Sequence, residues 1–163
     1  NRRFKLGPNI LITFENTKTM KFQIQEMMRA ERMVHDSQIE EEIDVYNPLI
    51  PKGNELSATL FIEITDPEKI RPVLDSFIGL TEGVNVYFEF NGEKVAAVFE
   101  EGREKEDNIS SVHYIRFPFT SAQKNKFASD SNAILINIDY NSYTHSVELS
   151  QEMIESLSND FSN

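Results

Sequence analysis

The sequence contains no cysteine and no tryptophan, and it has no long apolar segment. A chain without cysteine forms no disulfide, no thiolate metal site and no thiol nucleophile. No apolar run approaches the roughly 20 residues that a helix needs to cross a bilayer, and no secretory signal is recognisable. We therefore expect a cytoplasmic protein that has no membrane partner.

Positive charge is scarce as well: 16 Lys and Arg stand against 27 Asp and Glu, which gives a net charge of −11. Nucleic acids are bound by clustered Lys and Arg, and the basic cluster here is a short terminal group, Arg2, Arg3 and Lys5. The six glycines are isolated from one another, so no phosphate-cradling loop is present. We expect no nucleic-acid partner.

What the chain does contain is enough for a folded domain. Its 163 residues, 39% of them hydrophobic and twelve of them Phe, can bury a core of ordinary size. We expect one domain over residues 1–163. Because the chain opens with Asn and not Met, we also expect that the natural N-terminus is missing.

The order of the expected elements indicates an α+β fold. Residues 9–15 predict a strand, residues 19–35 a long helix, and residues 38–50 a second helix; the short connection predicts a helical hairpin. Later strands flank Asn91-Gly92 and Asn141-Ser142, which are typical of β-hairpin turns. Residues 120–132 are polar and predict a loop with at most one helical turn. We expect an antiparallel curved sheet or a partly open barrel built from hairpins, with the N-terminal helical hairpin packed against it.

The first helix carries a carboxylate and an imidazole on its apolar side. At about 100° per residue, Glu31 falls inside the arc of the apolar residues and His35 lies one turn further on. That arc contains Met20, Ile24, Met27, Met28 and Val34. Because an ionised carboxylate facing a core is costly unless it is paired or liganded, we predict that Glu31 and His35 form a polar centre.

Three interpretations of this polar centre stay open. The one we prefer is a structural hydrogen-bonded pair, Glu–His or Glu–Arg, that fixes helix packing. The second is a divalent metal site for zinc, iron or manganese, with further ligands from His113, His145 or a carboxylate. The third is an acid–base role, in which apolar surroundings raise the pKa of Glu31.

The other side of the same helix carries Gln25, Glu26, Arg29 and Arg32. These four residues predict either a charged groove for an anionic or peptide ligand or an internal ion pair between Glu26 and Arg29, which we prefer. Phe22 and Met33 lie around them, so this helix has apolar residues on two faces and is expected to lie sandwiched between neighbours. His113 and His145 alternate with other strand residues and are expected to be packed, satisfied histidines.

Several sequence blocks resemble a bacterial family known as domain-of-unknown-function family 3501. The blocks are Leu6-Gly-Pro8, Thr13-Phe-Glu-Asn16, residues 22–32, Tyr46-Asn-Pro-Leu-Ile-Pro51, residues 54–60 and Ile115-Arg-Phe-Pro118. The resemblance implies a further N-terminal segment that this chain lacks, and it implies no assigned activity. It also implies rubrerythrin and iron–sulfur oxidoreductase genes as companions, and therefore a link to redox or metal homeostasis.

Two functions follow from these observations. We expect a non-enzymatic binding or regulatory protein whose sheet edge or helical hairpin contacts a protein partner, such as a redox protein. The alternative is a metal-dependent enzyme or a metal-binding protein centred on Glu31 and His35. We prefer the first because no catalytic constellation is complete in the sequence.

Overall fold

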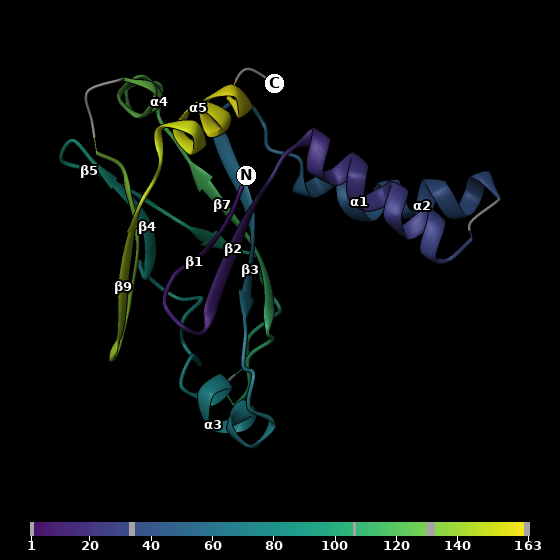
Figure 1. Ribbon diagram of the computed structural model, residues 1–163, viewed down its shortest axis with the longest axis horizontal. Helices are drawn as coiled ribbons and strands as arrows, with labels where there is room; N and C mark the ends of the chain where they lie inside the picture. The colour runs from purple at the N-terminus through teal and green to yellow at the C-terminus, as the bar shows by residue number, and fades with distance from the viewer. Residues whose placement is uncertain (1, 33–34, 106, 130–132, 162–163) are drawn as a thin grey trace.

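The computed structural model describes residues 2–32, 35–105, 107–129 and 133–161. Within them the chain forms two antiparallel sheets and five α-helices (Figure 1), which confirms the α+β prediction. The first sheet has the order β1 (Arg3–Lys5), β2 (Ile10–Glu15), β3 (Glu55–Ile62), β7 (Val112–Pro118) and β6 (Val98–Phe99). The second has the order β5 (Glu93–Ala96), β4 (Val86–Phe90), β8 (Leu135–Tyr140) and β9 (Tyr143–Glu148).

Both sheets are open, so the expected single curved sheet or partly open barrel is corrected to two separate sheets. The predicted hairpin turns are present, with Asn91, Gly92 and Asn141 at positive φ, as tight turns between antiparallel strands require. The chain changes sheets at Ala97: β5 pairs with β4, whereas β6 pairs with β7 in the first sheet. This change of sheet is why hairpins close in sequence do not build one continuous sheet.

The core lies between the two sheets and is rich in phenylalanine. Phe14 and Phe117 of the first sheet meet Phe88 of the second, with ring centroids 5.7 Å apart for Phe14–Phe88 and 4.7 Å apart for Phe88–Phe117. One end of the core is covered by α4 (Ser121–Ala128) and α5 (Gln151–Asp160) (Figure 1), which bury Phe127 and Leu157. The short η2 (Pro67–Lys69) and α3 (Ile70–Asp75) lie at the opposite end.

The two N-terminal helices, α1 (Thr17–Ala30) and α2 (Asp36–Tyr46), contact each other and extend away from the sheets as an arm (Figure 1). Met20 is the buried residue of α1, and none of the residues described in α2 is buried. A hairpin packed on a sheet face is therefore not confirmed. The short η1 (Asn47–Leu49) leads from α2 back to the body.

The helix predicted over residues 19–35 ends earlier, at Ala30. Its start is fixed by a capping box, in which the Asn16 side chain accepts a hydrogen bond from the Thr19 backbone N–H and the Thr19 hydroxyl accepts one from the Asn16 N–H. At the other end Glu31 is the C-cap, and Arg32 has φ +50°, a left-handed conformation that cannot continue a helix. Amphipathic periodicity continues past this point in the sequence, which is why the longer helix was expected.

Candidate functional site

The structure does not form the predicted polar centre on the first helix. Glu31, the C-cap of α1, and His35, the N-cap of α2, are both exposed. Because the helix ends before Glu31, the two residues do not occupy successive turns of one helix. The prediction that both side chains face apolar neighbours is therefore wrong. Met33 and Val34, which were expected to lie near them, fall outside the described residues.

The metal interpretation finds no geometric support in the part of the chain that the structure describes. No group of three or more His, Cys, Asp or Glu side chains that could hold a metal ion is found there. His113 is buried in β7, where its Nε2 lies 2.7 Å from the Ser110 carbonyl oxygen. His145 packs beside Tyr143 on β9, at a centroid distance of 4.6 Å.

On the outer side of α1, the preferred ion pair is confirmed. The Arg29 guanidinium donates to Glu26 Oε1 at 2.5 Å, while Gln25 and Arg32 are exposed. Phe22 on the same side is 63% exposed. The helix is therefore not sandwiched within one chain, and its second apolar face is uncovered.

A groove that was not expected crosses the outer face of the first sheet at the base of the arm. We call it the basal groove. It consists of three adjoining hollows of about 600, 300 and 160 Å³. Glu15, Gln23 and Phe61 line both the first and the second, and Leu49 and Tyr114 line both the second and the third. Strand residues form its floor, and the first turns of α1 and η1 form its walls.

A buried carboxylate lies where the first two hollows meet. Glu15, at the end of β2, is 9% exposed. Its Oε2 accepts a hydrogen bond from the Thr19 hydroxyl at 2.6 Å, and its Oε1 accepts one from the Thr59 hydroxyl at 3.2 Å. Glu15 forms no ion pair with any other described residue. Two neutral hydroxyls offset only part of the cost of burying a charge, so this site favours a cation that enters the groove.

The rest of the groove is arranged around this carboxylate. Arg3 and Lys18 line the first hollow beside Phe22, and Met20, Tyr46 and Phe61 line the second. The third hollow is bordered by Val98, which is 57% exposed. Two of the large apolar side chains that the structure leaves exposed therefore lie at opposite ends of one groove, an arrangement typical of interaction surfaces.

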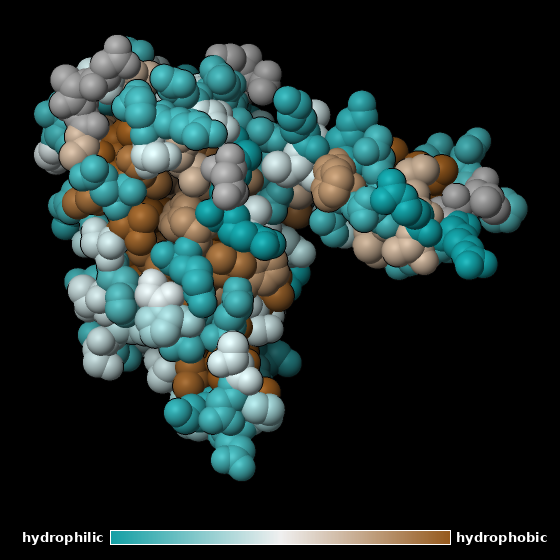
Figure 2. Space-filling model, in the orientation of Figure 1, coloured by the Kyte–Doolittle hydropathy of each residue, from teal (hydrophilic) through white to brown (hydrophobic). Residues whose placement is uncertain are grey.

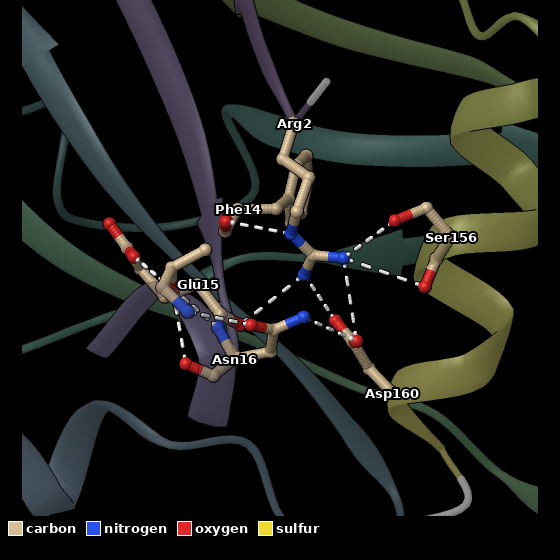
Figure 3. A network of polar contacts seen from close by, with 7 residues as sticks. Arg2, Phe14, Glu15, Asn16, Ser156 and Asp160 are labelled. Carbon is tan, nitrogen blue, oxygen red and sulfur yellow. Dashed lines mark hydrogen bonds and ion pairs between the residues drawn. The ribbon is translucent and has the colours of Figure 1, made fainter. Parts of the chain in front are cut away.

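The start of the arm is held by a network that joins the two ends of the chain (Figure 3). The Arg2 guanidinium donates to the Phe14 carbonyl oxygen at 3.1 Å and forms an ion pair with Asp160 of α5. The Asn16 side chain, which caps α1, also donates to Asp160, at 3.2 Å. Because Asn16 adjoins Glu15, this network fixes the wall of the basal groove relative to its floor.

Sequence reasoning missed the basal groove because its parts come from distant segments. Strand pairing brings Thr13 opposite Thr59, and Thr59 opposite Tyr114, and neither register can be read from local pattern. One signal was present: Glu15 ends an apolar strand and is followed at once by a helix cap. A carboxylate in that position lies where a sheet and a helix diverge.

The comparisons with known proteins agree with the resemblance seen in the sequence. The chain is similar to a solved structure described as a novel protein of unknown function from Burkholderia pseudomallei, with 29% identity and a TM-score of 0.86. The match covers 98% of this chain and 83% of that one. No curated protein matches, and no helix among the described residues has the length and apolar character of a membrane span. The family model for a protein of unknown function, DUF3501, matches residues 1–161, so the chain belongs to the DUF3501 family.

Proposed function

We propose that this chain is a non-enzymatic binding or regulatory protein, and that its basal groove binds a segment of a protein partner. The segment carries a cationic side chain flanked by apolar side chains. The observation on which this depends is the Glu15 carboxylate, which is 9% exposed, lines two hollows of the groove and is held by hydroxyls alone.

The shape of the groove favours a peptide segment over a small molecule. The groove crosses the five strands of the first sheet, which at about 4.8 Å between strands corresponds to roughly 19 Å. An extended chain of about six residues has that length. Small-molecule sites usually enclose most of the ligand, whereas this one is an open surface that follows the sheet.

The side chains of the groove define the chemistry of the segment. A Lys or Arg that reaches Glu15 would form a charge-assisted hydrogen bond. Its apolar neighbours would contact Phe61, two residues beyond Thr59 on β3, and Tyr114, the partner of Thr59 on β7. An acidic group or a chain terminus would meet Arg3 and Lys18 at the first hollow.

The family resemblance supplies a context for the partner. The resemblance implies companion genes for rubrerythrin and iron–sulfur oxidoreductases, and therefore a partner from redox or metal homeostasis. A chain without cysteine has no thiol chemistry of its own to contribute, so a binding role beside a redox protein fits this context. The geometry around Glu31 and His35 gives no comparable support to a metal-dependent enzyme.

The experiment uses a blocked hexapeptide, Leu-Ser-Lys-Ser-Leu-Ser, titrated into ¹⁵N-labelled protein. In an extended chain its leucine and lysine side chains point to the same side and can face the groove together. We expect amide shifts at Glu15, Thr59, Phe61 and Tyr114. Glu15→Gln should weaken binding about tenfold, the loss of one charge-assisted hydrogen bond of about 1.4 kcal/mol. Glu148→Gln, an exposed change on the second sheet, is the matched control and should leave the affinity unchanged.

Two results would overturn the proposal. One is a set of shifts that lies away from the groove. The other is an equal response to a hexapeptide in which glutamate replaces lysine, because a site organised around a buried carboxylate must discriminate between the two signs of charge.

A further inference from the structure

The arm presents an apolar stripe that it does not cover by itself. Ile24 and Met28 of α1 and Ile39 and Ile43 of α2 are each only half-buried. Two adjacent helices bury the parts of their apolar stripes that face each other. The apolar side chains on either side of this contact stay accessible to solvent. In four-helix bundles a second pair of helices covers these apolar side chains. Figure 2 accordingly shows apolar surface among the polar side chains of the arm.

The two helices of the arm carry opposite charge. Three cations, Lys18, Lys21 and Arg29, and one acid, Glu26, lie within α1. The second helix, α2, carries five acids and no cation: Asp36, Glu40, Glu41, Glu42 and Asp44. Within the described residues no ion pair joins the two helices, and none involves Lys21 or any of these five acids. Apart from the Glu26–Arg29 pair within α1, the charges of the arm form no ion pair with the described residues.

The charges of the arm lie beside the apolar stripe. At about 100° per residue, Lys21 falls next to Met28 on α1, and Glu40 falls next to Ile43 on α2. In an antiparallel pair of helices these two edges point to the same flank of the arm. That flank therefore combines apolar side chains with one cationic and one acidic border, and such a surface is complementary to a copy of itself.

We propose that two copies of this chain associate through their arms to form a four-helix bundle, with α1 of each copy against α2 of the other. A two-fold arrangement makes every contact twice, so the cationic edge of each α1 lies along the acidic edge of the other copy's α2. Packing α1 against α1 would instead oppose like charges, and the charge pattern selects against it. The residues named for this contact do not line the basal groove, so the inference goes beyond the proposed peptide binding and does not depend on it.

The extended position of the arm makes this contact feasible for an acidic protein. Each copy has a net charge of −11, and the arm extends away from the sheets (Figure 1). An α1 of 14 residues is about 21 Å long, so the interface lies at the low end of the range for specific complexes. We therefore expect association that depends on protein concentration.

Sedimentation equilibrium of the full chain from ~1 to ~100 μM tests the proposal. We expect a monomer–dimer equilibrium. Lys21→Glu and Glu40→Lys should each weaken the dimer at least ~10-fold, because each places a like charge along the edge of the partner helix, and the two-fold axis does so twice. An equimolar mixture of the two variants should restore a heterodimer, since both opposed pairs are then of unlike sign.

Matched controls are available on an exposed segment outside the arm. Lys69→Glu and Glu68→Lys in η2 make the same charge changes on exposed residues and should leave the dimer constant unchanged. Circular dichroism and the urea unfolding transition report whether each variant is folded. A wild-type protein that stays monomeric at ~100 μM overturns the proposal, as does a dimer that is unaffected by both charge reversals.

Discussion

The binding proposal depends on Glu15. Because Glu15 is buried, the stabilities of its variants can distinguish a role in binding from a role in holding the fold together. A buried carboxylate without a cation costs stability, whereas a glutamine of similar shape still bonds the Thr19 and Thr59 hydroxyls. Urea unfolding should therefore show Glu15→Gln to be as stable as the wild type or up to about 1 kcal/mol more stable. Glu15→Ala, which leaves both hydroxyls without a partner, should lose about 1–3 kcal/mol. A glutamine variant that is strongly destabilised would mark Glu15 as a structural residue.

For Glu31 and His35 we expect substitution by alanine to change the free energy of unfolding very little, because both residues are exposed. Both residues stand at helix ends, but the His35 side chain makes no capping hydrogen bond, and replacing exposed side chains that make no such bond usually changes stability by less than about 0.5 kcal/mol. We expect Glu31→Ala and His35→Ala to stay within that range, and to leave unchanged the metal content of protein purified without chelator or affinity nickel. Elemental analysis together with urea unfolding checks both. A stoichiometric metal that disappears in both variants would restore the alternative function.

His113 gives stability a defined dependence on pH. Its side chain is fully buried, and among the described residues its Nδ1 has no hydrogen-bond partner. Burial holds the pKa of His113 below its usual 6.5; the Ser110 carbonyl and the Glu104 and Glu100 charges oppose this shift, and the Arg103 charge adds to it. At pH 7 the ring is therefore neutral in the folded protein.

The direction of the pH effect follows from the lowered pKa of His113. As pH falls below 6.5 the unfolded chain binds a proton that the folded chain does not, so the free energy of unfolding decreases. The slope from this one site reaches at most about 1.4 kcal/mol per pH unit. His113→Gln should make the decrease between about pH 7 and 5.5 shallower, as measured by urea unfolding. An unchanged slope in His113→Gln would contradict the expectation.

At the scale of elements, the first turn of α1 contributes both to the stability of the fold and to the wall of the basal groove. Asn16 caps α1 and also bonds Asp160, so Asn16→Ala should cost about 1–2 kcal/mol. Because the first turn of α1 forms a groove wall, this variant should also bind the leucine–lysine hexapeptide more weakly. Thr120→Ala removes a comparable capping box from α4. It should cost similar stability and leave peptide binding intact, and equal loss of binding in both variants would contradict the assigned role of Asn16.

The elements themselves were predictable where local chemistry decides them. The hairpins at Asn91 and Asn141 and the helix that Ser150 caps follow from turn and capping residues. α4 was expected to be a loop because its sequence is polar, and Phe127 is the one residue that it buries. The end of α1 was misplaced because Arg32 adopts positive φ, a conformation that apolar periodicity does not indicate. The Glu15 site required the register of β2 on β3, which pairs residues more than forty positions apart.

At the scale of the whole molecule, the arm and the body should behave as parts with separate roles. Met20 is the buried hydrophobic residue of α1, and the core cluster consists of residues of the sheets and their connections together with α4 and α5. A variant in which a short Gly-Ser linker replaces residues 24–43 should therefore retain a cooperative unfolding transition, with a free energy of unfolding within about 1 kcal/mol of that of the monomeric full chain. Because the apolar stripe and four of the five acids of α2 are removed, the variant should sediment as a monomer at every concentration. Calorimetry and sedimentation equilibrium test these two expectations. A shortened chain that does not unfold cooperatively would show that the arm belongs to the folding core. A shortened chain that still dimerises would show that the interface lies on the body.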